Sequence, residues 1–457
     1  MAVLIKQCRI LACALFVFIF VGCSNEEPVI EPGWQLAQDI PRLKIQTRLD
    51  HHLLSHDEVQ STEDYVEATL SIDGQGVYED QGITTIKIRG RGQSTFAQPK
   101  KPYKIKLPVQ ESLLGLPPGQ EWALLANFQD GPLMCSMLAM KLGHILEMPF
   151  TPVLVPVEVS INNEYLGVYW LTAHKEVAPE RIALDEEGLL LEFVRAGQRA
   201  ERPEDKDFYQ FQSTNFNLWV QIHHPSLHKV AMQDLELAQK QFGEIVRQWE
   251  EWEQAILDRS FSHDYGQILD KTSLAHLLII YQFTRNIALN TPQSIYLHKN
   301  KDQVLTFGPL WDFDEAYGGS AYREYFIHNM DQDVLTGTQP GTQFFEVLLQ
   351  DPELHKILKK EWKIFRQKGL GELRVFMANY VDLLDNTGAY QRDYARWYKE
   401  QDATKESQRK TLRAYEKDMN LWLDQRAGYM DKLLKDWKKE RVSSFKLSSR
   451  SNICRNG

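Results

Sequence analysis

Two aspartates stand two residues apart in the segment Phe307–Asp314, which reads FGPLWDFD. The apolar start of this segment predicts a strand that delivers Asp312 and Asp314 into a loop rich in aromatic residues. Carboxylate oxygens close to phosphate and water are the usual protein ligands of Mg²⁺. The alternatives are that one aspartate caps a turn while the other pairs with an arginine, or that both serve a glycosidase. Carboxylates so close in sequence rarely bracket one glycosidic bond.

Basic side chains gather in a second segment, between Ile86 and Leu107. The cationic residues around its glycine-bearing loop are Arg89, Arg91, Lys100, Lys101 and Lys104. Gly90 and Gly92 allow the backbone to approach a ligand closely, and backbone N–H groups beside Arg and Lys suit polyphosphate oxygens. The alternative is a solvated basic hairpin without a ligand.

Strands in the first half and helices in the second half are expected to position these segments. Alternating hydrophobicity predicts strands over 68–72, 85–88, 103–107, 155–161 and 165–171, and two short strands within 295–310. Helical periodicity predicts helices over 133–147, 232–257, 274–284 and 419–437, and another that begins with Asp351 as its cap and Pro352 as its first residue. This order of elements predicts an α+β fold.

The composition excludes some classes of function. Of 457 residues, 43% are hydrophobic and 11% aromatic, which is typical of a well-packed globular protein. The formal net charge is −10, and an acidic protein is repelled by nucleic-acid phosphates, so we expect no nucleic acid partner. The mature chain would keep too few cysteines for a disulfide framework.

The N-terminus predicts export. Lys6 and Arg9 precede an apolar run, Ile10–Val21, that is too short for a mature transmembrane helix. The small residue before Cys23 resembles a bacterial lipobox, so we expect a signal peptide over 1–22, a lipid on Cys23 and a tether over 23–45. The alternative is an ordinary signal peptide. A lipid-anchored protein would lie in the cell envelope, at the outer membrane or the cell surface, without a spanning helix.

Six segments in order resemble the CotH (spore coat protein H) family of atypical protein kinases. They are 86–95 (IKIRGRGQST), 99–107 (PKKPYKIKL), 122–127 (WALLAN) with Asp130, 162–169 (NNEYLGVY), 294–297 (SIYL) with Lys299, and 311–314 (WDFD). The resemblance implies an atypical protein-kinase-like fold over 46–440, with a mainly β part over 46–230 and a mainly helical part over 231–440. We expect residues 441–457 to be a loose tail.

The same resemblance implies an activity. The γ-phosphoryl group of ATP would pass to serine of a secreted or surface protein, with Mg²⁺ or Mn²⁺ as the metal. Lys104 would contact the phosphates and Arg89 and Arg91 would shape their loop. Asp312 and Asp314 would hold the metal and act as the catalytic residues.

Three positions depart from the family pattern: Ala173, Gln282 and Ala288 stand where acids are expected. Position 288 resembles the aspartate that orients the attacking hydroxyl and accepts its proton. Loss of such a base costs roughly 10²–10⁴-fold in rate. An active kinase, an inactive pseudokinase that keeps the nucleotide, and a surface binding or scaffold lipoprotein therefore remain alternatives.

Overall fold

The computed structural model describes residues 39–47, 64–92, 94–195, 210–258, 265–318, 326, 329–399 and 410–453, with side chains up to Lys435 in the last range. The expected signal peptide 1–22, Cys23 and the tether up to residue 38 lie outside the described residues. All described residues belong to one compact unit. This unit contains both sheets and helices, which confirms the α+β class.

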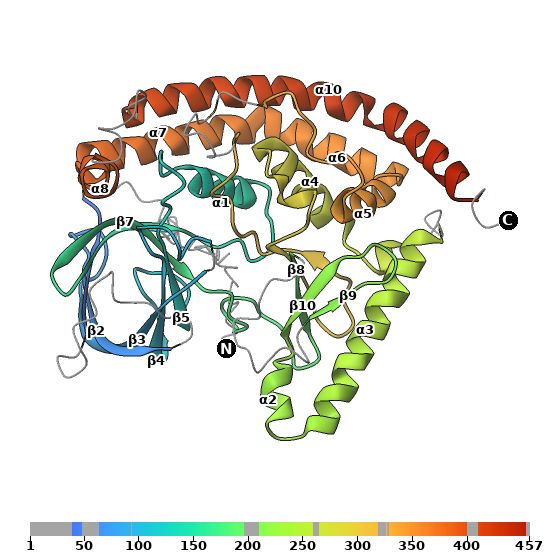
Figure 1. The fold of residues 1–457 in the computed structure, drawn as a ribbon. Helices are drawn as coiled ribbons and strands as arrows, with labels where there is room; N and C mark the ends of the chain where they lie inside the picture. The colour runs from blue at the N-terminus through green and yellow to red at the C-terminus, as the bar shows by residue number, and fades with distance from the viewer. Residues whose placement is uncertain are drawn as a thin grey trace, which may run out of the picture. The chain divides into compact units, whose positions relative to one another are not determined.

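Seven strands form a closed barrel in the order β1-β2-β3-β4-β5-β7-β6, most of them labelled in Figure 1. The strands are β1 (Arg42–Thr47), β2 (Val66–Asp73), β3 (Gln81–Gly90), β4 (Tyr103–Glu111), β5 (Gly119–Leu125), β6 (Val155–Ile161) and β7 (Glu164–Ala173). A parallel pairing of β1 with β6 closes the barrel. β1 therefore begins inside the segment predicted as a tether, because the buried side chains of Leu43 and Ile45 belong to the barrel core.

A second sheet has five strands in the order β12-β11-β8-β10-β9. They are β8 (Leu189–Val194), β9 (Gln210–Gln212), β10 (Trp219–His224), β11 (Ile295–Lys299) and β12 (Thr306–Phe307). One face of this sheet, with Leu191 and Leu297, packs into the main hydrophobic core. The other face carries Leu190 and Tyr296, which pack against Ala123 of the barrel strand β5.

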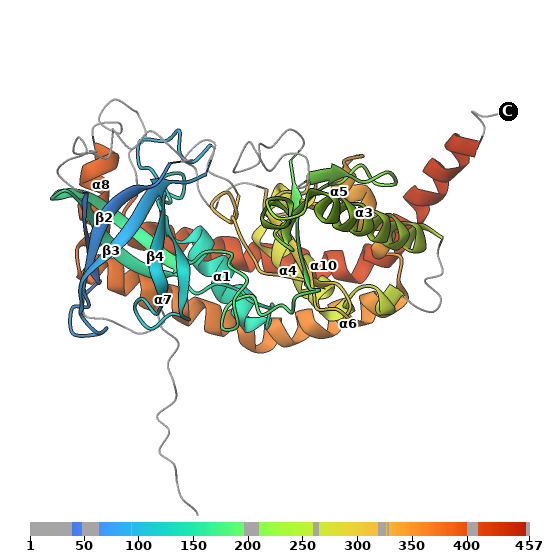
Figure 2. The ribbon, with the colours of Figure 1, turned by 90° about the horizontal axis from the view of Figure 1, so that it is seen from below.

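Helices cover the main core. They include α1 (Cys135–Ile145), α4 (Lys271–Thr284), α5 (Pro340–Leu348), α6 (Pro352–Ile364), α7 (Leu370–Asn386) and α10 (Leu412–Ile453). α10 lies alongside α6 and α7, as both ribbon views show (Figures 1 and 2). It continues to Ile453, so the backbone is helical through much of the segment predicted as a loose tail. No described helix combines the length and hydropathy that a membrane span requires.

The cap of α6 matches its sequence prediction, since the Asp351 carboxylate accepts the N–H of Glu353 at 2.8 Å and Pro352 opens the helix. Shorter helical turns are η3 (Tyr265–Gln267), η4 (Ile287–Leu289) and the π-helical turn η5 (Phe365–Gly369). The cap follows from rules that are local in sequence.

Helix α8 (Ala389–Trp397) fixes the C-terminal helices to the barrel. The Lys100 ammonium and the Asp393 carboxylate form a buried ion pair of 2.6 Å. Lys100 also donates to the carbonyl of Val168 at 2.6 Å, and the Val168 N–H donates to Asp393 at 2.8 Å. The Lys100 ammonium is therefore used to hold α8 against the barrel. The sequence grouped Lys100 with the predicted phosphate-binding residues, but its side chain does not lie with them.

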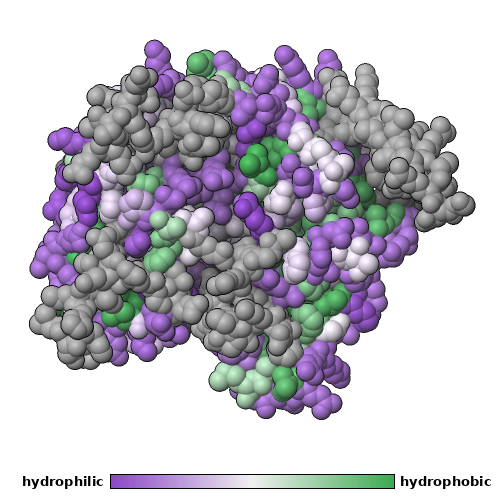
Figure 3. All heavy atoms as spheres, viewed as in Figure 1, coloured by the Kyte–Doolittle hydropathy of each residue, from purple (hydrophilic) through white to green (hydrophobic). Residues whose placement is uncertain are grey.

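Helix α3 (Leu235–Leu257) matches the periodic segment 232–257 and is capped by Asp234. With the short α2 (Leu227–Ala231) it forms a helical pair. Three large apolar side chains near the junction of the two helices are exposed: Met232, Leu235 and Leu237. The junction of α2 and α3 forms the lower tip of the molecule in Figure 1, and the space-filling view shows hydrophobic colour there (Figure 3).

Candidate functional site

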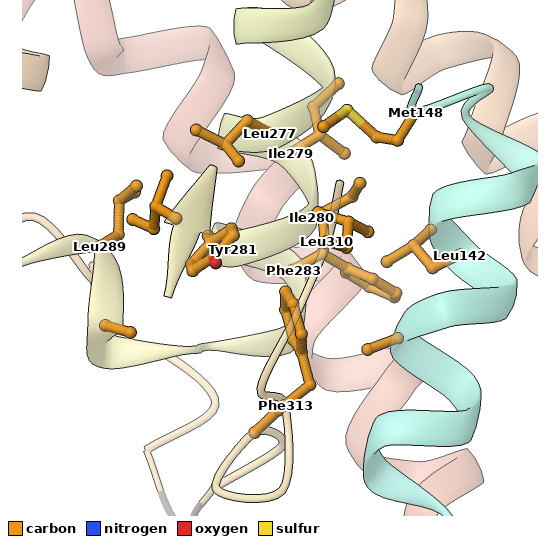
Figure 4. Close-up of a cluster of buried hydrophobic side chains, with 14 of the residues drawn as sticks. Leu142, Met148, Leu277, Ile279, Ile280, Tyr281, Phe283, Leu289, Leu310 and Phe313 are labelled. Carbon is orange, nitrogen blue, oxygen red and sulfur yellow. The ribbon is translucent and has the colours of Figure 1, made fainter. Parts of the chain in front are cut away.

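The loop after β12 carries both predicted metal ligands. Trp311 is 8% exposed and packs with Ala123, Ile182, Leu190 and Tyr296, a cluster that we call the barrel–sheet junction. The following Phe313 turns back into the main core, where its ring lies 5.0 Å from that of Tyr281 on α4 (Figure 4). Alternate aromatic residues of the WDFD segment are therefore anchored in two different clusters.

Asp312 lies between these two aromatic anchors and is exposed. Its backbone has φ +67°, a left-handed conformation that is uncommon for a non-glycine residue. The Ser294 hydroxyl donates to its carboxylate at 3.3 Å, and the Asn286 amide donates to its carbonyl at 3.2 Å. The segment before β11 and the turn after α4 thus hold this loop in place.

Asp314 is partly buried and stands beside Asp312. Burial raises the pKa of Asp314 well above its ordinary value, and the Asp312 charge and a hydrogen bond with Asp312 raise it further. The charges of Glu315 and, more weakly, Asp130 raise the pKa of Asp314 in the same direction. Neighbouring carboxyls that repel each other would be stabilised by a cation. Asp312 and Asp314 are therefore brought together, and their hard oxygen donors fit Mg²⁺.

Few protein side chains are available to bind the metal ion. Within the described ranges, no group of three or more His, Cys, Asp or Glu side chains could hold a metal ion. Mg²⁺ usually needs only one or two protein carboxylates, because waters and substrate phosphates complete its shell. Two carboxylates on the metal loop are compatible with a site that forms together with a nucleotide.

The three predicted phosphate contacts lie on the barrel. Arg89 of β3 pairs in register with Lys104 of β4, and Lys104 pairs with Ala123 of β5. Directly opposed residues point to the same face of a sheet. Since the side chain of Ala123 belongs to the barrel–sheet junction, Arg89 and Lys104 lie on the barrel face that meets the second sheet.

A chain of side-chain contacts connects Lys104 with the metal loop. The Lys104 ammonium lies 2.8 Å from the Glu121 carboxylate, which lies 3.5 Å from Nδ1 of His174. The His174 ring is 6.2 Å from that of Trp311, and the Arg91 guanidinium lies 5.5 Å from the centre of the same indole. Lys104 is thus linked to Trp311, the residue next to Asp312, through Glu121 and His174, whereas Arg91 contacts Trp311 directly.

Glu121 and His174 were missed by the sequence prediction. Burial raises the pKa of Glu121, but hydrogen bonding from His174 and the charge of Lys104 outweigh it and hold this pKa well below its ordinary value. Glu121 therefore stays ionised opposite Lys104. Its position was recognisable only through the register of three strands, since it lies 17 residues from Lys104 in sequence.

Glu192 is a second missed carboxylate. It interrupts the apolar strand β8 and is buried, and a lone acid in such a run could have signalled a polar contact. His223 approaches it at 2.6 Å and the Lys175 ammonium at 3.8 Å. Burial raises its pKa, but Lys175 and His223 outweigh burial, so the pKa is lowered. Lys175 also lies over the rings of Tyr296 and Trp311, at 4.4 and 5.3 Å, which places this group at the barrel–sheet junction.

The three replaced acids lie in three different surroundings. Ala173 pairs in register with Trp122, whose side chain belongs to the barrel core, so it points away from Lys104. Gln282 is completely buried; its amide donates to Asp333 at 2.6 Å and accepts the N–H of Val334 at 3.2 Å. A carboxylate could not make both contacts.

Position 288 is linked to the metal loop through Asn286. Ala288 is in the turn η4, where its N–H donates to the side-chain oxygen of Asn286 at 3.0 Å. The same Asn286 side chain donates to the carbonyl of Asp312. Ala288 is thus linked to the metal loop by hydrogen bonds through Asn286, whereas the side chains of Ala173 and Gln282 point into the barrel interior and the main core.

A search of curated proteins finds no significant match. The family model described as CotH kinase protein matches residues 87–430. This range covers more than half of the chain and includes Arg89, Lys104, Asp312 and the missed Glu121 and Glu192. The chain therefore belongs to the CotH kinase family.

Proposed function

We propose that this protein binds ATP with Mg²⁺ at the barrel–sheet junction. The observation that carries the proposal is the contact chain Lys104–Glu121–His174–Trp311, which joins a buried cation of the barrel to the loop of Asp312 and Asp314. Triphosphate recognition requires both positive side chains and metal-binding carboxylates on one site. Membership of a kinase family supports the same ligand.

Each residue has a role in this proposal. Lys104 and Arg89 bind phosphate oxygens, and Arg91, which lies over the Trp311 ring, supplies a further cation beside the metal loop. Asp312 and Asp314 would hold Mg²⁺ or Mn²⁺. When bound, this ion would neutralise phosphate charge. Glu121 keeps Lys104 oriented, as its low pKa leaves it ionised at neutral pH. The apolar side chains of the junction exclude water from the phosphates.

Phosphoryl transfer to serine of a secreted or surface protein is the activity that we propose, and we expect it to be slow. Ala288 offers no carboxylate to orient a serine hydroxyl or accept its proton. The second candidate, a pseudokinase that binds nucleotide without transfer, is favoured by this same replacement. The replacements at Gln282 and Ala173 are weaker support for a pseudokinase, because their side chains pack in the main core and point into the barrel interior, respectively.

The proposal includes a place in the cell. The leader over 1–22 and a lipid on Cys23 would tether the protein to the cell envelope, at the outer membrane or the surface. A lipid anchor needs no spanning helix. Acceptor proteins would then be exported or surface proteins, and nucleic acid would not be a partner of this acidic chain.

Transfer of labelled phosphate from ATP to a serine-rich acceptor protein tests the activity. We expect weak, Mg²⁺-dependent transfer by the unmodified chain and at least a tenfold increase in Ala288→Asp, because a general base contributes roughly 10²–10⁴-fold. Ala173→Glu is the matched control and should give no increase, since that position points away from Lys104. An Ala288→Asp variant that binds ATP but transfers no faster would contradict this account of position 288.

A further inference from the structure

A hollow on the outer wall of the barrel lies at the seam where β1 pairs with β6. Its volume is about 350 Å³, and its polar lining is Arg42, Lys44, Glu158, Ser160, Tyr165 and Arg392. We call these six residues the seam site. Four elements contribute to it: β1, β6, β7 and α8. It shares no residue with the barrel–sheet junction.

The strand register explains why these side chains meet. Arg42 lies directly opposite Glu158, and Lys44 lies directly opposite Ser160. Opposed residues share a face, and the alternate residues Leu43 and Val159 point into the barrel core. All four polar side chains therefore point outward, where Tyr165 joins them from β7 because it pairs with Ser160.

One buried carboxylate organises the cationic side chains. Arg392 donates to both Glu158 oxygens at 2.8 Å, and the Tyr165 hydroxyl donates to one of them at 2.6 Å. Arg42 lies 3.8 Å from Glu158 and also pairs with Asp39 at 3.1 Å. Hydrogen bonding to Glu158 and burial both raise the pKa of Tyr165, burial more strongly, so this hydroxyl remains a donor.

Two neighbouring donors in the seam site are unused. Among the residues that the structure describes, the Lys44 ammonium has no ion-pair or hydrogen-bond partner, and neither does the Ser160 hydroxyl. The seam site holds three cationic side chains and faces three carboxylates: Glu158, Asp39 and Asp73, which lies directly opposite Arg42 on β2. Lys44 is the cationic side chain of the seam site that no described carboxylate pairs with, and its ammonium beside the Ser160 hydroxyl favours an anionic ligand with several acceptor oxygens.

We propose that the seam site binds the phosphate monoester of a small chemical group, in particular the side chain of a phosphorylated serine. Phosphate offers three acceptor oxygens to Lys44, Ser160 and Arg42, whereas a carboxylate offers two. The volume is near the lower end of the range of ligand pockets, so it fits one side chain and its neighbours. The choice of phosphoserine among phosphate monoesters rests on the proposed function, because a kinase would meet this group in its product.

A flat membrane surface fits the seam site less well. The hollow is partly enclosed by α8, and an acidic protein is repelled by anionic lipid. Binding of a phosphoserine segment there would hold a phosphorylated acceptor to the barrel while the barrel–sheet junction remains free for further transfer.

Calorimetric titration of the whole mature chain tests the proposal. The probes are a blocked tripeptide with phosphoserine, the same tripeptide with glutamate, inorganic phosphate, and vesicles with anionic phospholipid. We expect the phosphoserine peptide to bind, and Lys44→Gln or Ser160→Ala to weaken its binding at least tenfold and about threefold, respectively. Lys359→Gln on α6, also an exposed lysine without a described partner, is the matched control and should bind like the unmodified chain.

Each outcome decides the question. Equal binding of the glutamate peptide would overturn the phosphate preference, and binding of vesicles alone would replace phosphoserine by a lipid. An unchanged affinity in Lys44→Gln would remove the seam site as the location. Asp312→Asn separates the two proposals, because it should lose the response to Mg²⁺-ATP and keep phosphoserine binding.

Discussion

Asp130 is a fully buried carboxyl at the start of α1, near the metal loop. Its two oxygens accept the N–H groups of Met134 and Cys135 at 3.2 and 2.7 Å. Burial raises its pKa from 3.8 to about 6, although these hydrogen bonds act in the opposite direction. The same side chain raises the pKa of Asp314. Asp130, three residues after the WALLAN segment, thus influences the metal loop without belonging to it.

The raised pKa of Asp130 predicts how stability depends on pH. Between pH 4 and pH 6 the folded state keeps a proton that the unfolded state has lost, so the free energy of unfolding falls as pH rises. A rise in pKa from 3.8 to about 6 corresponds to about 3 kcal/mol. Asp130→Asn should remove most of this decrease in the free energy of unfolding with rising pH. Urea unfolding at several pH values measures the effect. An unchanged slope in the variant would show that Asp130 titrates normally.

At the scale of elements, α8 joins the helices to the barrel through a buried ion pair. The carboxylate of Asp393 accepts from Lys100 and from the N–H of Val168. Gly167 next to it has φ +92°, and a Cβ there would lie 2.2 Å from Asp393. The close approach of α8 and β7 therefore requires glycine at position 167, because any side chain there would clash with Asp393.

Removal of one partner from this pair should be costly. Asp393→Ala leaves the Lys100 ammonium buried without its counter-charge, and we expect a loss of about 3–5 kcal/mol in the free energy of unfolding. Asp382→Ala breaks the exposed ion pair of Asp382 with Arg413 and is the matched control, with an expected loss below about 1 kcal/mol. Chemical denaturation measures both. Similar losses in the two variants would mean that α8 is not held by this pair.

Strands and helices with clear periodicity were predicted well, whereas the closure of the barrel was not. The hairpin of β6 and β7 and the Asp351 cap follow from neighbouring residues. The parallel pairing of β1 with β6 joins residues more than 110 positions apart, and no local pattern indicates it. β1 is short and follows a segment rich in Glu, Pro and Gly, so its alternation was too brief to separate it from a tether.

At the scale of the whole molecule, the candidate site depends on the contact between the barrel and the second sheet. Sequence motifs led to the prediction of Lys104, Asp312 and Asp314 as site residues because their residue types match a known pattern. They did not identify Glu121, His174 or Lys175, whose importance comes only from the register of β4, β5 and β7 and from the position of Trp311. They also grouped Lys100 with the phosphate contacts, although its ammonium is buried under α8.

Binding of nucleotide at this junction can be measured as thermal stabilisation of the mature chain by ATP. A ligand at about 100 times its Kd stabilises by about 2.7 kcal/mol, which is a shift of several degrees in Tm for a chain of this size. We expect this shift to require Mg²⁺ or Mn²⁺, to be lost in Asp312→Asn and Lys104→Met, and to persist in Lys359→Gln. An equal shift in all four proteins, or no shift in the unmodified chain, would contradict the account.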